Sequence, residues 1–245
     1  MTATATATAL LEARDLTAGY GDLAAVRGVN FVVHPGEVIA LFGPNGAGKT
    51  TTLLTLVGIL PPLSGEVFWL GSPSRAPLHR RVREGMAFVP EGRSVVPTMS
   101  TRDNLRLGSG GVEGAVAIFP ELERLLDRPA GLLSGGEQQM LTLAQSLALR
   151  PKVLLADELS LGLAPIVTNR LMETLRRAAD DDGVAVVLVE QQVRRALDVA
   201  DRWYVLRRGE VVATGDRTTD VSEIELSYLI EATEAGRSEA DGNHD

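Results

Sequence analysis

Residues 41–52 read Leu-Phe-Gly-Pro-Asn-Gly-Ala-Gly-Lys-Thr-Thr-Thr, a glycine-rich loop that ends in a lysine and three threonines. Its central part, Gly43 to Thr50, fits the pattern Gly-x-x-x-x-Gly-Lys-Ser/Thr. We expect a strand before the loop and a helix after it. The apolar run Glu37–Phe42 stops at the first glycine, and Lys49–Leu60 has helical length and apolar spacing. Glycines let backbone N–H groups converge on phosphate oxygens, and a helix N-terminus adds a partial positive charge.

This loop predicts a site for ATP and Mg²⁺. The Lys49 ammonium would reach the β- and γ-phosphates, the Thr50 hydroxyl would ligate Mg²⁺, and Thr51 would contact the α-phosphate. A glycine-rich turn without a ligand is the alternative. The chain has only two lysines, Lys49 and Lys152, among 24 basic residues, which favours a specific need for an ammonium in the loop. The expected nucleotide-binding residues of the loop are Gly43, Pro44, Asn45, Gly46, Ala47, Gly48, Lys49, Thr50 and Thr51.

Other apolar runs predict strands that alternate with helices, an order typical of crossover units and a parallel sheet. Between Glu91 and Arg150 this rhythm stops, because the segment contains helix-compatible stretches and no strong strand. We interpret that segment as a helical insertion. The expected strands are Leu10–Leu16, Gly28–Val33, Met86–Val89, Lys152–Ala156 and Val184–Val189, with a helix at Val167–Ala179 and a strand–turn–strand at Arg202–Val212 around Arg208 and Gly209.

Composition limits the class of protein. The 245 residues are 44% hydrophobic, enough for a sizeable core. A net charge of −8 argues against a nucleic-acid partner. The chain has no cysteine, no apolar stretch long enough to span a bilayer and no signal-peptide pattern, which together indicate the cytoplasm. We expect frayed tails at residues 1–9 and 232–245.

A second acidic site follows the run Val153-Leu-Leu-Ala. Asp157 at the strand end would hold the Mg²⁺ shell, and Glu158 is placed to polarise an attacking water. Two acids that merely cap a strand are the alternative. The phosphate loop about a hundred residues upstream favours the catalytic interpretation.

A third motif, Leu133-Ser-Gly-Gly-Glu-Gln-Gln139, precedes an apolar-periodic helix. It would form a second helix N-terminus able to bind an anion. An ordinary capped helix, with Ser134 as N-cap and Glu137 completing a capping box, is the alternative and is compatible with it.

These motifs together resemble ATP-binding subunits of ABC transporters, over about residues 10–230. The resemblance implies a P-loop NTPase fold of the α/β class: a RecA-like mixed sheet, an N-terminal antiparallel β subdomain and an inserted α-helical subdomain. It implies an ATP-binding core at residues 10–90 and 151–231 with the helical signature subdomain at 91–150. It also implies head-to-tail pairing with a second copy or a sister ATPase, so that Ser134, Gly135 and Gly136 act on ATP held by the other subunit.

Three further positions gain roles from the resemblance. Tyr20 resembles the aromatic residue that stacks on adenine. Glu91 stands where most members carry a glutamine that touches Mg²⁺ and water, and Gln191 where most carry the histidine that contacts the γ-phosphate. With Ser160–Pro165 and Ala200–Leu206, these choices resemble the LivF-type ATPases of high-affinity branched-chain amino acid importers. Such ATPases work at the cytoplasmic face of the membrane with permease subunits and, indirectly, an external solute-binding protein.

Several residues depart from the general family pattern, although none removes a phosphate or metal ligand. They are Ala156, Leu159, Ala164 and Gln145, together with a glycine-rich stretch at residues 106–117. The alternatives to branched-chain amino acid import are uptake of urea or amides, a non-transport ABC ATPase and a catalytically weak subunit. A small-molecule kinase would lack the Leu133–Gln139 motif.

Overall fold

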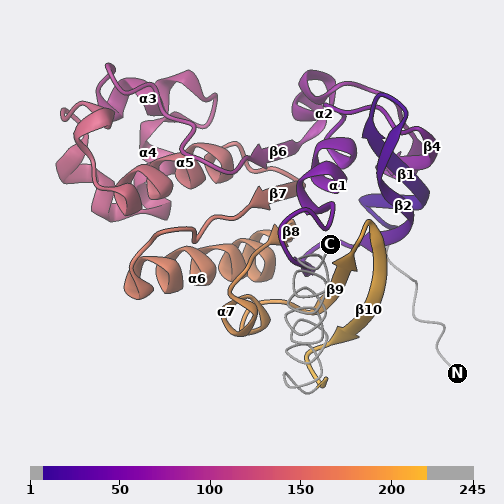
Figure 1. Ribbon diagram of the computed structural model, residues 1–245. Coiled ribbons are helices and arrows are strands. Elements are labelled where there is room, and N and C mark those ends of the chain that lie inside the picture. Colours follow the sequence, from indigo (N-terminus) through magenta and orange to yellow (C-terminus); the bar gives the residue numbers. More distant parts are fainter. Residues whose placement is uncertain (1–7, 220–245) are drawn as a thin grey trace, which may run out of the picture.

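Two β-sheets form the body of the computed structural model, which describes residues 8–219 (Figure 1). The larger sheet has six strands in the order β10-β9-β3-β8-β7-β6. All neighbours in it are parallel except β9 and β10, which form an antiparallel hairpin. The expected parallel sheet and the expected hairpin are both confirmed. The strands are β3 (Val38–Phe42), β6 (Met86–Val89), β7 (Val153–Asp157), β8 (Ala185–Val189), β9 (Arg202–Arg207) and β10 (Glu210–Asp216).

The smaller sheet is antiparallel, with the order β2-β1-β4-β5. It confirms the antiparallel β subdomain that the resemblance implies. Strands β4 and β5 of this sheet were not expected. β4 buries only Val67 and Trp69, so its alternation of apolar and polar residues is too short to predict a strand. The strands are β1 (Leu11–Tyr20), β2 (Leu23–Val33), β4 (Ser64–Trp69) and β5 (Ser72–Pro73).

The core lies on both faces of the larger sheet, because successive side chains of a strand point to opposite sides. On β3, Val38 and Phe42 face one hydrophobic cluster, which includes side chains of the helical segment and of α6 (Pro165–Asp182). Ile39 and Leu41 face the other cluster, which includes side chains of α1 (Lys49–Leu56) and of the smaller sheet. All four are buried, so β3 is a central strand fixed from two sides.

Four helices within residues 8–219 belong to the α/β part. The first was expected to reach Leu60 and ends earlier, because Gly58 takes a left-handed conformation with φ 82°. The short helices α2 and α7 were not expected. The helices are α1 (Lys49–Leu56), α2 (Leu78–Glu84), α6 (Pro165–Asp182) and α7 (Val193–Leu197).

Between β6 and β7 the chain forms helices and no strand, as expected. The stretch Glu121–Leu126 is a 3-10 helix rather than an α-helix, and it begins at Pro120. The elements are α3 (Thr101–Leu107), α4 (Gly111–Ile118), η1 (Pro120–Leu125), η2 (Ala130–Leu132) and α5 (Gly135–Ala148). The domain boundaries at residues 90 and 150 stay a prediction. The tail at 232–245, most of the tail at 1–9 and the end of the core at 220–231 lie outside the described residues.

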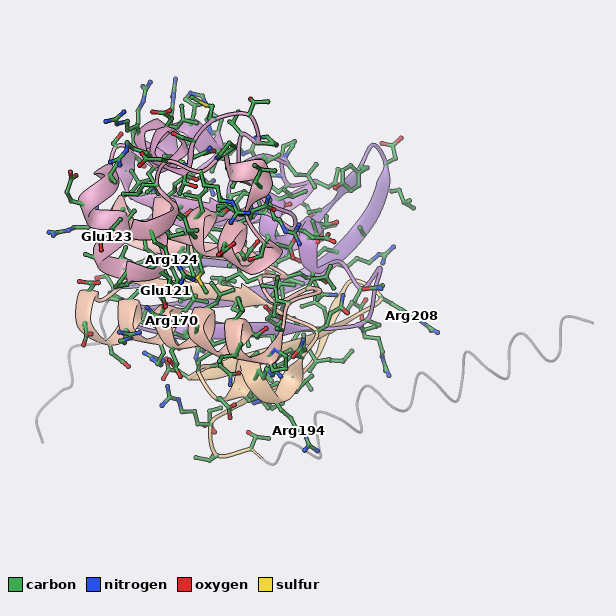
Figure 2. All side chains as sticks on the ribbon, turned by 90° about the vertical axis from the view of Figure 1, so that its left-hand side faces the viewer. Glu121, Glu123, Arg124, Arg170, Arg194 and Arg208 are labelled. Carbon is green, nitrogen blue, oxygen red and sulfur yellow. The ribbon has the colours of Figure 1, made fainter. Side chains whose placement is uncertain are left out.

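A polar contact ties the helical segment to α6. The Arg170 Nε donates to Glu121 Oε1 at 2.9 Å, and Arg170 Nη2 donates to the carbonyl of Ile118 at 3.2 Å. The same guanidinium lies over the Phe119 ring, 5.1 Å from its centroid. Figure 2 shows Arg170 and Glu121 next to each other on neighbouring elements. None of the helices in residues 8–219 has the length and apolarity needed to cross a bilayer.

Candidate functional site

The phosphate loop joins β3 to α1, as the sequence predicts. The helix begins at Lys49 after Gly48, which has φ 103° and no side chain to cap the helix. The first N–H groups of the helix therefore stay available to an external acceptor. The Lys49 Nζ donates to the carbonyls of Gly43 at 2.8 Å and Pro44 at 3.2 Å, which folds the ammonium over the loop.

Replacing Gly43 by alanine is expected to lower the free energy of unfolding by about 3 kcal/mol. Gly43 has φ 151°, and a Cβ added there would lie 2.4 Å from the carbonyl oxygen of Leu206. Gly46 is the matched control, because it has φ 80° with nothing within 4 Å of an added Cβ. Gly46→Ala should cost about 1 kcal/mol from backbone strain alone. Denaturant unfolding of both variants checks this, and equal losses would contradict the predicted clash.

A cavity of ≈ 630 Å³ opens in front of the loop. Nine of the residues proposed from sequence line it, and Ala25 and Leu161 line it as well. Neither of these two was predicted as a site residue, although Leu161 lies in the Ser160–Pro165 stretch. The nine are Asn45, Gly46, Gly48, Lys49, Thr50, Thr51, Glu91, Glu158 and Gln191. Residues from the ends of β6, β7 and β8 meet here, since the carboxyl ends of adjacent parallel strands share one edge of the sheet.

Asp157 lies beneath the cavity and is 1% exposed. Its Oδ2 accepts a hydrogen bond of 2.8 Å from the Thr50 hydroxyl. Its Oδ1 has no hydrogen-bond partner among the described residues. Burial raises the pKa of Asp157, and the Thr50 hydrogen bond opposes that rise. A buried carboxylate oxygen without a partner beside a hydroxyl suits a hard cation such as Mg²⁺.

Glu158 follows Asp157 with a left-handed backbone, φ 48°. Both carboxylate oxygens accept from the Gln191 Nε2 at 2.9 Å, and Oε1 lies 3.9 Å from the Lys49 Nζ. Burial lowers the pKa of Lys49, while the charges of Glu158 and Asp157 oppose this. The arrangement presents one oriented carboxylate, one amide and one ammonium to the same cavity.

The Leu133–Gln139 motif lies away from this cavity. Its Ser134 Oγ accepts from the Glu137 N–H at 3.3 Å, and Glu137 Oε2 accepts from the Ser134 N–H at 2.8 Å, so the capping box is confirmed. Packing accounts for Gly136, because an added Cβ would lie 2.8 Å from Val167.

Two other residues of the motif have defined surroundings. Gly135 lies against the Arg93 guanidinium, and Gln138 donates to the carbonyl of Ala130 at 2.9 Å. Both contacts lie within the chain, and Ser134 is exposed at the helix start. Among the predicted site residues, Tyr20 also lies outside the cavity lining, at the end of β1 with 59% exposure.

Comparison with known proteins settles the family. The family model described as "ABC transporter" matches residues 26–160. The chain belongs to the ABC transporter family. The cassette is 39% identical over 222 residues to the high-affinity branched-chain amino acid transport ATP-binding protein BraG of Pseudomonas aeruginosa, covering 86% of the chain and 95% of that relative.

Two further relatives have similar coverage. The cassette is 33% identical to the probable branched-chain amino acid transport ATP-binding protein LivF of Archaeoglobus fulgidus, covering 84% of the chain and 92% of that relative. It is 34% identical to the lipopolysaccharide export system ATP-binding protein LptB of Escherichia coli, covering 86% and 92%. The resemblance to the importer ATPases is therefore confirmed, and the cassette is an ATPase of this family.

Solved structures show the same fold. A structure described as the ATP binding subunit of an ABC transporter matches with a TM-score of 0.77 and 26% identity, over 89% of the cassette and 98% of that chain. An ATP-binding cassette solved as a dimer bound to ADP and Pi matches with a TM-score of 0.76 and 24% identity, over 86% and 100%. The expected P-loop NTPase fold, with its inserted helices, is confirmed.

Proposed function

We propose that this cassette is the ATP-hydrolysing subunit of an importer for branched-chain amino acids. The observation that carries the proposal is the 39% identity to BraG over 86% of the chain. The residues that mark the importer subclass in the sequence, Glu91 and Gln191, both line the cavity. The subunit would sit at the cytoplasmic face of a membrane, bound to permease subunits.

The reaction is the hydrolysis of ATP by water to ADP and phosphate. The Lys49 ammonium and the amides of the loop bind the phosphates, and the Gln191 amide binds the γ-phosphate. Glu158 orients the attacking water and accepts its proton as the new oxygen–phosphorus bond forms and the bond to the β–γ bridging oxygen breaks. The Gln191 Nε2 also donates to both oxygens of Glu158, which orients that carboxylate in the cavity.

Three residues fit a Mg²⁺ ion. The unpartnered Asp157 Oδ1, the Thr50 hydroxyl and the Glu91 carboxylate are oxygen donors of the kind this ion takes. No set of three His, Cys, Asp or Glu side chains within residues 8–219 is grouped to hold a metal. Two carboxylates and one hydroxyl suit Mg²⁺, because this ion takes a few protein oxygens and completes its shell with waters and phosphate oxygens. A bound Mg²⁺ ion held by these residues would supply positive charge that stabilises the negative charge of the phosphates during hydrolysis.

The ATP site is completed by a second subunit in this proposal. Ser134 is exposed at a capped helix start and lies away from the cavity of its own chain. Ser134, Gly135 and Gly136 would therefore cover ATP bound to the partner, while Tyr20 would stack on adenine in its own chain. The dimeric cassette bound to ADP and Pi has the same fold, which supports this pairing.

The branched-chain substrate can be tested by reconstitution. We expect leucine, isoleucine and valine, delivered by the cognate binding protein, to raise ATP turnover several-fold when the cassette is reconstituted with its permease in proteoliposomes. Transport coupling makes turnover depend on the solute that the permease accepts. Urea, acetamide and lipopolysaccharide serve as comparison substrates, the last because of the likeness to LptB. Stimulation by one of these alone, or by none, would contradict the assignment.

A further inference from the structure

A buried carboxylate lies directly behind the catalytic cavity. Glu190 is the first residue after β8 and is 2% exposed. Its Oε1 accepts the Ser160 N–H at 3.0 Å, and its Oε2 accepts the Ser160 hydroxyl at 2.5 Å. Ser160 is itself 2% exposed. No basic side chain of the described residues forms an ion pair with Glu190. Burying an acid is costly unless hydrogen bonds compensate for the lost water, and the two bonds from Ser160 supply that compensation.

Strand pairing brings this contact next to the proposed water-activating group. Asp157 pairs with Val189 across the parallel strands β7 and β8, so the residues after both strands leave the sheet together. The Glu158 N–H then donates to the Val189 carbonyl at 2.9 Å.

Beyond this point the segment that follows β7 and the segment that follows β8 form side-chain hydrogen bonds at two places. Glu158 and Gln191 line the cavity and bond to each other. Ser160 and Glu190, each one or two residues away along the chain, are buried and bond to each other. The first pair therefore faces the cavity, and the second pair lies buried behind it.

Glu158 needs such a support because its backbone is unfavourable. A φ of 48° is a left-handed conformation that a side chain with a Cβ seldom adopts. Such strain persists only where surrounding contacts over-determine the conformation. The Glu190–Ser160 contact anchors the residue two positions after Glu158, and it therefore restrains the turn that aims the Glu158 carboxylate.

We propose that Glu190 is a positioning residue for ATP hydrolysis, which acts through Ser160 to fix Glu158 and Gln191. The inference rests on the proposed role of Glu158. Glu190 acts by geometry and not by its charge. Its carboxylate lies outside the cavity lining, and Ser160 occupies both of its oxygens.

The test compares variants that separate geometry from charge. Glu190→Met keeps the length of the side chain and removes both acceptors, so kcat should fall about 10-fold or more while the KM for ATP changes less than about 2-fold. Glu190→Gln can accept the Ser160 N–H with its oxygen and donate its amide to the hydroxyl. It should recover kcat to within about 3-fold of wild type. Ser160→Ala removes only the hydroxyl and should lower kcat about 3-fold.

A double variant tests whether the two residues act through one contact. Glu190→Met with Ser160→Ala should be no slower than Glu190→Met alone, because residues that share an interaction are not additive. Glu210→Met, at an exposed glutamate of β10, should keep the wild-type rate. Thermal unfolding and ATP binding establish that each variant is folded. If Glu190→Met does not fold, Ser160→Ala carries the test.

Three results would overturn the inference: wild-type kcat in Glu190→Met or Ser160→Ala, effects of the two that multiply in the double variant, or a Glu190→Gln that is as slow as Glu158→Gln. The last would mean that the charge of Glu190 acts directly. Failure of the proposed function is a different outcome, in which Glu158→Gln itself keeps the wild-type rate.

Discussion

Glu158→Gln is expected to slow ATP hydrolysis by about 10²- to 10⁴-fold and to leave ATP affinity unchanged within a few-fold. The substitution keeps the size of the side chain and one oxygen that can accept from Gln191, so the local structure should persist. It removes the negative charge and the basic oxygen that would take a proton from water. Single-turnover hydrolysis and equilibrium binding of ATP measure the two effects separately.

The matched control is Glu210→Gln, the same exchange at an exposed position of β10. It should hydrolyse ATP at the wild-type rate. A Glu158→Gln variant as fast as this control would rule out Glu158 as the general base. Equally slow turnover by wild type and Glu158→Gln would instead identify a catalytically weak subunit.

Lys49→Ala is expected to weaken ATP binding at least about 100-fold. Charge-assisted hydrogen bonds contribute about 1.5–3 kcal/mol each, and about 2.7 kcal/mol corresponds to a factor of 100 in affinity. Lys49→Arg should fail to restore binding, because a planar guanidinium does not fit where a compact ammonium bonds to the carbonyls of Gly43 and Pro44. Isothermal titration with ATP and Mg²⁺ gives the affinities.

Lys152 provides the control for this second substitution. It is the other lysine of the chain, and it is exposed. Lys152→Ala should bind ATP with wild-type affinity. Wild-type affinity in Lys49→Ala, with an intact fold by circular dichroism, would contradict the placement of the phosphates on this loop.

The sequence predicted the central sheet well, because its strands are buried on both faces. Runs such as Val184–Val189 and Met86–Val89 are apolar at every position. Such runs can be identified as buried strands from the local sequence alone. The loop at Gly43–Thr50 was equally clear, since its glycines and its lysine follow from the chemistry of phosphate binding. The structure places this loop between β3 and α1, as the pattern predicts.

Contacts between distant residues could not be predicted in the same way. The Glu190–Ser160 contact joins residues 30 positions apart and exists only because β7 and β8 pair in one particular register. The fit of Gly136 against Val167 on α6, where an added Cβ would clash, depends in the same way on how two helices pack, and the ligand role of Gly136 stays a prediction. Both contacts depend on tertiary structure, so the local sequence does not predict them.

The two lysines have opposite environments, which has a practical consequence for protein chemistry. An amine-acylating reagent meets one solvent-facing side-chain amine, at Lys152, and one nearly covered amine in the cavity, at Lys49, which is 5% exposed. A nucleotide seated over the loop shields the second amine and leaves the first open. The ratio of the two acylated peptides in a mass spectrum then measures occupancy of the site against an internal standard, in a crude membrane extract and without a labelled nucleotide.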